Sequence, residues 1–127
     1  MFKPLAAFSG VTVQDLDEAK KFYTTVLGLT LSDETMGLQF KLPGGGQLFI
    51  YEKKDHTPAT FTVLNFVVED IDQAVDDLTE SGVTFERYPG APQDDKNIAR
   101  GRKVGMGPDI AWFADPAGNI ISVLQDK

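Results

Sequence analysis

Apolar and polar positions follow one shared pattern in two segments of the chain, residues 11–31 and 66–86. Each segment holds an apolar strand, an Asp-apolar-Asp step, an alanine, an amphipathic stretch and a glycine. Asp15 aligns with Asp70 and Ala19 with Ala74, both at an offset of 55 residues. Self-similarity of this kind is a stronger guide to architecture than any local pattern. Because two copies are too few for a solenoid, the pattern predicts a duplicated supersecondary unit.

Both segments carry the boundary signals of a helix. Asp15 and Asp70 are well placed as N-caps, because a carboxylate accepts hydrogen bonds from the free amides of the first turn. Gly28 and Gly82 lie where a helix commonly ends in a left-handed residue. Between these boundaries the apolar residues recur at helical spacing, which predicts one buried stripe on each helix. The stripes are Leu16, Ala19, Tyr23, Val26 and Leu27 in the first segment, and Ile71, Ala74, Val75 and Leu78 in the second.

The rest of each half is typical of strands. "LQFKL" alternates apolar and polar residues, and "GGGQLFIYEK" is a turn followed by an apolar run. "DIAWF" and "NIISVLQ" play the same parts in the second half, joined by the turn "ADPAG". The predicted fold class is α+β, with two β-α-β-β-β units. We expect a single domain over residues 1–127, with unit 1 at about 1–55, a linker at 53–60 and unit 2 at about 60–127.

This order of elements, together with "DLDEAKKFYTTVLG" and "DPAGNIISVLQ", resembles the vicinal oxygen chelate superfamily. That group includes glyoxalase I, extradiol dioxygenases, fosfomycin-resistance enzymes and bleomycin-resistance proteins. The resemblance covers nearly the whole chain. It implies curled, mixed sheets rich in antiparallel pairs around a cup-shaped cavity, with the helices outside, and a homodimer. The same scaffold hosts lyases, transferases, dioxygenases and sequestering proteins, so the site must decide the function.

The resemblance also implies where a metal would bind. Metal-dependent members take their ligands from the first and last strands of each unit, and the matching positions here are Phe8, Ile50, Val63 and Ser122. The repeat supports the last pair, since aligning Gly46 with Gly118 places Ile50 opposite Ser122. A transition-metal site needs several imidazole or carboxylate groups, which these residues do not offer. The sequence therefore predicts no metal and no cofactor.

Strand alternation extends this set of positions to a candidate ligand pocket. We expect the cup to be mainly apolar, with a few hydrogen-bonding groups, as is usual for a small-molecule site. Its predicted lining is Phe8, Thr12, Ile50, Glu52, Val63, Asn65, Trp112 and Ser122. Alternatively, the aromatic residues belong to the core and the polar ones to ordinary strand surface. The opposite strand positions, among them Phe49, Tyr51, Leu64, Ile121 and Val123, should pack under the helices.

Two further features carry candidate chemistry. His56, the single histidine, lies in the polar linker, where a solvated residue is the ordinary expectation. Residues 94–109 hold one third of the basic residues and several glycines, which predicts a mobile flap. Such a flap either offers Arg100 and Arg102 to a ligand carboxylate or phosphate, or is a solvated loop balanced by acidic neighbours. The basic residues are Lys96, Arg100, Arg102 and Lys103, and the acidic ones Asp94, Asp95 and Asp109.

Composition narrows the function classes. The net charge of −7 argues against nucleic acid or an anionic membrane as partner. The absence of cysteine excludes disulfides and thiolate chemistry, and no segment resembles a membrane span or a cleavable signal, which predicts a cytoplasmic protein. The leading hypothesis is metal-independent binding of a small, partly apolar organic molecule, for sequestration, sensing or carriage.

Two other classes stay open. One is a glyoxalase-like lyase or dioxygenase-like enzyme with a non-standard site, although such reactions normally depend on a metal that polarises substrate oxygens. The other is a non-catalytic subunit or regulatory module that dimerises through exposed strand edges.

Overall fold

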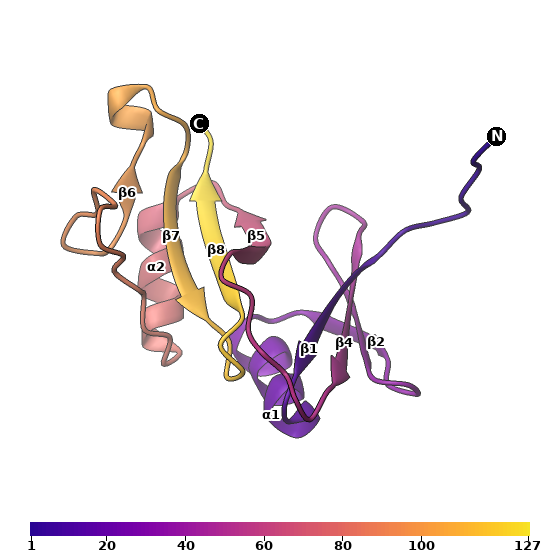
Figure 1. The fold of residues 1–127 in the computed structure, drawn as a ribbon. Helices are drawn as coiled ribbons and strands as arrows, with labels where there is room; N and C mark the ends of the chain where they lie inside the picture. The colour runs from indigo at the N-terminus through magenta and orange to yellow at the C-terminus, as the bar shows by residue number, and fades with distance from the viewer. The chain divides into compact units, whose positions relative to one another are not determined.

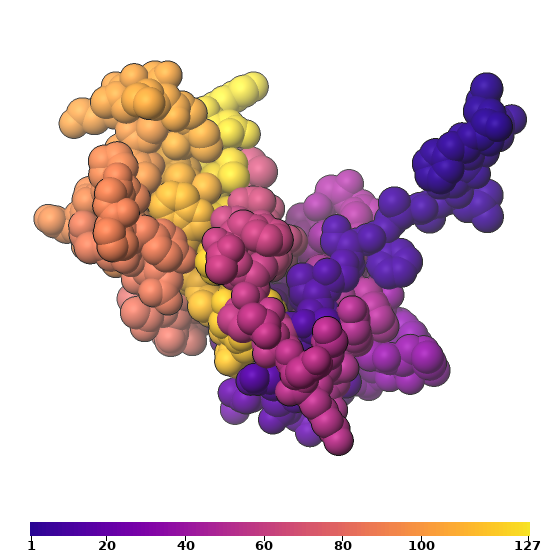
Figure 2. Space-filling model, viewed as in Figure 1, coloured from indigo at the N-terminus to yellow at the C-terminus, as the bar shows by residue number.

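The computed structural model describes residues 1–127, and the chain divides into two units, Met1–Thr57 and Pro58–Lys127 (Figures 1 and 2). Each unit contains a four-stranded mixed sheet and one main helix in the order β-α-β-β-β. The predicted α+β fold of two repeated units is therefore confirmed. None of the helices is long and apolar enough to span a lipid bilayer.

The first unit begins with an exposed segment and then forms a sheet with strand order β1-β4-β3-β2. Figure 2 shows the N-terminal residues, in indigo, extending away from the rest of the unit, and Met1, Phe2 and Leu5 are exposed. Strands β1 and β4 are parallel and the other pairs antiparallel. The elements are β1 (Ser9–Val13), α1 (Leu16–Lys21), η1 (Phe22–Val26), β2 (Thr30–Asp33), β3 (Leu38–Lys41) and β4 (Gln47–Glu52).

The helix of the first unit starts and stops where its sequence signals lie. The Asp15 carboxylate accepts hydrogen bonds from the amides of Asp17 (3.0 Å) and Glu18 (3.2 Å). After Lys21 the helix widens into the π-helical turn η1 rather than continuing as the expected α-helix. The chain then turns at Gly28, whose φ of 69° is open to glycine at little cost. The π turn places Tyr23 in the core, with its ring centroid 5.7 Å from that of Phe40.

The strand β4 is one residue out of phase with the sequence-based expectation. Ile50 is 0 % exposed and pairs with Val11 and Leu38 on the face of the sheet that α1 and η1 cover. The prediction that Ile50 lines a pocket is therefore wrong. Glu52 has the same strand phase as Ile50 and pairs with the buried Val13, although its own side chain is exposed at the strand end.

The reason for the slip lies in the turn before β4. The loops at 42–46 and 115–119 are equivalent: Leu42 N–H donates to the Gly46 carbonyl (2.8 Å), as Asp115 N–H donates to Asn119 (2.9 Å). Gly118 therefore matches Gly45, and both have positive φ, 86° and 104°. Three consecutive glycines hide this match in the sequence. The repeat counterpart of Ser122 is Phe49, which faces away from the helix together with Tyr51.

The second unit has strand order β5-β8-β7-β6, with β5 parallel to β8 and the other pairs antiparallel. In Figure 1 helix α2 lies behind strands β7 and β8, so one face of this sheet is covered by the helix. The elements are β5 (Thr62–Val67), α2 (Ile71–Glu80), β6 (Ala99–Arg100), η2 (Arg102–Val104), β7 (Asp109–Ala114) and β8 (Ile120–Gln125).

In the second unit the predicted strand faces agree with the structure. Leu64, Ile121 and Val123 are buried on the side of the sheet that packs with Ile71 and Val75 of α2. The Asp70 carboxylate caps α2 by accepting from the Gln73 amide at 3.2 Å. Because side chains alternate along a strand, Asn65, Trp112 and Ser122 lie on the opposite face. We call this side of either sheet, turned away from its helix, the helix-free face.

Candidate functional site

The helix-free face of the second unit brings together three of the predicted site residues. Ser122 on β8 pairs with Asn65 on β5 and with Trp112 on β7. Its hydroxyl donates to Asn65 Oδ1 at 2.5 Å, and the serine is 0 % exposed. Trp112 is half-buried and Asn65 exposed. The arrangement is an aromatic ring beside a polar Ser–Asn pair, both set by the register of a continuous sheet.

The turn before β8 sets this register. Asp115 is 4 % exposed, and its carboxylate accepts from the amides of Ala117 and Asn119 and from the Asn119 side chain, each at 2.9 Å. An ionised carboxylate with several N–H donors is a strong local anchor. The "DPAGN" stretch thus builds the turn that delivers Ser122 into the sheet.

The helix-free face of the first unit is aromatic. The rings of Phe8 and Phe49 meet edge to face with centroids 6.3 Å apart, and Phe49 stacks with Tyr51 at 5.7 Å. Phe8 is 65 % exposed and Tyr51 43 %. Phe8 and Thr12 have the positions that the sequence predicts, whereas Phe49 and Tyr51 replace Ile50 and Glu52. Gly10 is the repeat equivalent of Asn65, which pairs with Ser122. Because Gly10 pairs with Phe49 in the structure, the strand register identifies Phe49 as the equivalent of Ser122.

His56 is buried, and the expectation of a solvated linker residue is wrong. His56 is only 7 % exposed, and its Nδ1 lies 2.6 Å from Thr12 Oγ1. Its backbone amide also donates to the Lys53 carbonyl at 3.0 Å. The histidine is therefore a structural partner of the end of β1, and it engages the hydroxyl of Thr12.

Val63 lies at an irregularity in the pairing of β5 with β8. The register shifts between Thr62 and Leu64, so Val63 is the extra residue of a bulge. Its side chain is half-buried. Strand alternation alone does not assign such a residue to a face, and its predicted ligand contact stays a prediction.

The basic residues of segment 94–109 are paired with acids. Arg100 forms a bidentate pair with Asp72 of α2, at 2.8 and 3.0 Å, and its Nε donates to Asp94 at 2.8 Å. Arg102 pairs with the buried Asp109 at 3.2 Å. The pairing of these arginines with Asp94 and Asp109 agrees with the alternative in which the loop is balanced by its acidic neighbours. The contact of Arg100 with Asp72 on α2 was not expected from the sequence. Both guanidinium groups already have carboxylate partners, which argues against their role toward a ligand anion.

The ion pairs of Asp72 should make the stability of the protein depend on pH. The hydrogen bond from Arg100 lowers the pKa of Asp72 to about 2, with a smaller contribution from Lys96. Because the folded-state pKa is lowered, the stabilisation is present above about pH 4 and is lost as the pH falls toward 2. The Asp72 side chain is 49 % exposed, so solvent screening limits its value to about 1 kcal/mol. Urea denaturation of Asp72→Asn should show this loss at pH 7 and a smaller one near pH 3.

The matched control for that prediction is Asp95→Asn. Asp95 is an exposed acid of the same segment without an ion pair. We expect its replacement to change stability little at either pH. Equal effects of the two substitutions would contradict the role assigned to the Asp72–Arg100 pair.

The residues at the metal-ligand positions of the family do not fit a metal ion. With Phe49 in place of Ile50, the set becomes Phe8, Phe49, Val63 and Ser122, which offers one hydroxyl and no imidazole or carboxylate. Elsewhere, no three His, Asp or Glu side chains form a group that could hold a metal ion. A transition-metal site needs such groups at about 2.0–2.2 Å.

Each unit also has an open surface pocket beside its helix. The pocket of the first unit, about 490 Å³, is lined by Leu16, Asp17, Lys20, Glu34, Thr35, Met36, Gly37 and Leu38. That of the second unit, about 370 Å³, is lined by Val75, Asp76, Thr79, Val83, Thr84, Phe85, Asp95, Lys96 and Asn97. Neither contains a predicted site residue.

The comparison with protein families identifies the class to which this fold belongs. The family model for the Glyoxalase/Bleomycin resistance protein/Dioxygenase superfamily matches residues 5–123. The chain therefore belongs to this superfamily, and the resemblance seen in the sequence is confirmed. A comparison with curated proteins found no match.

Solved structures of this fold include proteins of different function. TnmS3, an antibiotic binding protein from Streptomyces sp. CB03234, is 23 % identical with a TM-score of 0.70, over 99 % of this chain and 100 % of that one. A superfamily member from Sphaerobacter thermophilus is 25 % identical with a TM-score of 0.65, over 96 % and 98 %. The fosfomycin resistance protein FosX from Mesorhizobium loti is 15 % identical with a TM-score of 0.65, over 100 % and 95 %. These similarities support the fold alone.

Proposed function

We propose that this protein binds a small, partly apolar organic molecule without a metal ion, on the helix-free faces of its sheets. The proposal rests on the burial and the hydrogen bond of Ser122. Where metal-dependent members of the family have a carboxylate ligand, this chain has a buried hydroxyl that already donates to Asn65. Because that group is a neutral part of a hydrogen-bonded wall, it suits a pocket better than a metal centre.

The neighbouring side chains support binding rather than metal chemistry. Trp112 lies beside Ser122 in one unit, and Phe8, Phe49 and Tyr51 form a row of rings in the other. Apolar and aromatic walls with a few placed polar groups are the usual make-up of a small-molecule site. In this proposal each face acts by itself. In the second unit Trp112 provides contact area and the Asn65 amide provides hydrogen bonds, and in the first unit the three rings provide contact area.

The relatives are consistent with this proposal. TnmS3 is described as an antibiotic binding protein and FosX as a fosfomycin resistance protein, so the fold serves ligand binding and resistance in other chains. We propose sequestration, carriage or sensing of such a molecule for this chain. We further propose that it acts as a homodimer in the cytoplasm.

The test combines a metal titration with a metal-free binding assay. Isothermal titration with Zn²⁺, Ni²⁺, Fe²⁺ and Mn²⁺ should show no stoichiometric binding, because the donor groups are missing. The neutral fluorophore N-phenyl-1-naphthylamine should bind the chelator-treated protein, and addition of metal should not change its affinity. Trp112→Ala should weaken that binding about tenfold or more, since an aromatic wall is lost.

Two outcomes would refute the proposal. One is tight binding of one metal ion per site. The other is failure of the chelator-treated protein to bind the fluorophore. Glu80→Ala, a change at an exposed position of α2, is the control and should leave fluorophore binding unchanged.

A further inference from the structure

We propose that the surface formed by Glu86, Tyr88 and Trp112 in the second unit binds an organic cation, with Glu86 as counter-ion. This inference rests on the proposed function, because it names the charge of the small molecule that binds there. Neither Glu86 nor Tyr88 was among the residues expected from the sequence. Both follow α2 in a stretch without strand or helix periodicity.

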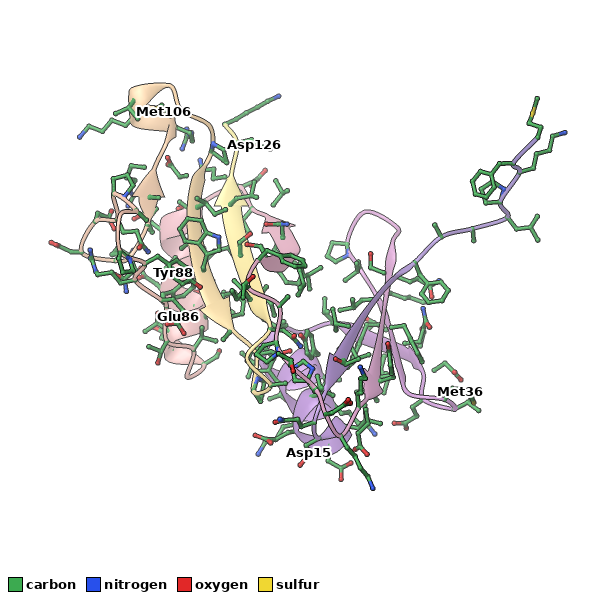
Figure 3. The ribbon with its side chains drawn as sticks, viewed as in Figure 1. Asp15, Met36, Glu86, Tyr88, Met106 and Asp126 are labelled. Atoms are coloured by element: carbon green, nitrogen blue, oxygen red, sulfur yellow. The ribbon has the colours of Figure 1, made fainter.

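The three residues are held together by backbone and ring contacts. The Glu86 amide donates to the Trp112 carbonyl at 2.8 Å, which fixes this segment alongside β7. Two residues further on, the ring of Tyr88 meets that of Trp112 edge to face, with centroids 5.6 Å apart and planes at 68°. The Tyr88 amide is fixed in turn by Gln93 Oε1 at 2.8 Å. Figure 3 shows Glu86 and Tyr88 near each other beside β7.

The carboxylate of Glu86 is available to a ligand. It is exposed and forms no ion pair in the structure. The adjacent Arg87 forms no ion pair with it, and its guanidinium donates instead to the carbonyls of Gln93 (3.3 Å) and Asp94 (2.6 Å). Burial raises the pKa of Tyr88, and the negative charge of Glu86 raises it further. The Glu86 carboxylate thus belongs to the same short segment that holds the Tyr88 ring against Trp112.

Aromatic rings and an unpaired carboxylate have complementary effects on a cation. The face of a Trp or Tyr ring attracts an ammonium or guanidinium group through its quadrupole, more strongly as the site is desolvated. Tyr88 and Trp112 are both half-buried, so part of each residue is covered by protein and part is open to solvent. A cation placed against this pair has Glu86 as its counter-charge.

The charge of the whole unit favours the same type of ligand. Residues 58–127 contain twelve Asp and Glu against six Lys and Arg. Of the six basic residues, Lys96, Arg100 and Arg102 already pair with carboxylates. An excess of negative charge raises the local concentration of cations and opposes the approach of anions. A cationic small molecule is thus complementary to this surface in charge.

The test uses two probes that share a shape and differ in charge. Choline and 3,3-dimethyl-1-butanol are nearly isosteric, but only choline is a cation. Trp112 is the only tryptophan of the chain, so its fluorescence reports directly on this surface. In a titration of the chelator-treated full-length protein, choline should bind about tenfold more tightly than the alcohol. Equal affinities, or tighter binding of the alcohol, would overturn the cation site.

Three variants locate the effect. Glu86→Gln should weaken choline binding about threefold to fivefold and leave the alcohol unaffected. Tyr88→Leu should also weaken choline binding while it preserves the Trp112 signal. Glu80→Gln, an exposed acid on α2, removes the same charge and should change neither affinity. If Glu80→Gln weakened choline binding as much as Glu86→Gln, the attraction would belong to the net charge and the site would be refuted.

The result is separable from the proposed function. Loss of choline selectivity with intact binding of N-phenyl-1-naphthylamine would refute the cation site alone. If choline selectivity were retained but the neutral fluorophore did not bind, only the proposed binding of partly apolar molecules would be refuted, and the cation site would stand.

Discussion

Replacing Asp115 by alanine is expected to lower the free energy of unfolding by about 3 kcal/mol. The carboxylate is almost fully buried and accepts hydrogen bonds from the amides of Ala117 and Asn119 and from the Asn119 side chain. Its removal leaves these donors unsatisfied in a place that water reaches poorly, which costs more than the hydrogen bonds themselves contribute. Urea denaturation followed by circular dichroism measures the loss.

Two further variants make that result specific. Asp115→Asn retains one oxygen acceptor, so we expect about half the loss. Asp126→Ala removes an exposed aspartate near the C-terminus and should change stability by less than about 0.5 kcal/mol. An effect of Asp115→Ala as small as that of Asp126→Ala would show that the turn does not depend on this carboxylate.

Replacing Ile50 by alanine is expected to cost about 3 kcal/mol, because a fully buried side chain is removed and a cavity remains. Phe49→Ala should cost much less, about 1 kcal/mol, because Phe49 is only half-buried on the helix-free face. The comparison is informative because Phe49 is the larger side chain. Chemical denaturation of both variants under the same conditions measures the order.

The strand phase of β4 decides the outcome of that comparison. If Phe49 packed under the helix and Ile50 lined a pocket, as the sequence alignment of Gly46 with Gly118 implied, the order of the two losses would be reversed. Ligand assays separate the variants as well. Phe49→Ala should also weaken binding of N-phenyl-1-naphthylamine, because it removes the middle ring of the row formed by Phe8, Phe49 and Tyr51.

Local signals in the sequence are sufficient for much of the fold. Asp15 and Asp70 cap their helices as expected, because capping depends on residues within one turn of each other. The β-α-β-β-β repeat follows from self-similarity and is independent of the exact boundaries. In the second unit, the residues buried under α2 and those on the opposite face also follow from strand alternation, because "DPAGN" marks the start of β8 unambiguously.

The site was less predictable, for reasons that differ between residues. A shift of one residue exchanges the two faces of a strand, and the run Gly44–Gly46 gave no indication of which glycine has the equivalent turn position. The environments of Arg100 and His56 depend on Asp72 and Thr12, which are 28 and 44 residues away. No local pattern reports such contacts.

By itself, the sequence determined the family, the repeated architecture and the absence of competent ligands at the metal positions, because these properties depend on residue types and on short-range spacing. The tertiary structure decided which side chains lie beside Ser122, that Phe49 is its repeat counterpart, that His56 is buried, and that Glu86, Tyr88 and Trp112 come together. These facts depend on strand register and on packing between distant segments. A change of one residue in register, invisible in composition and periodicity, is enough to alter them.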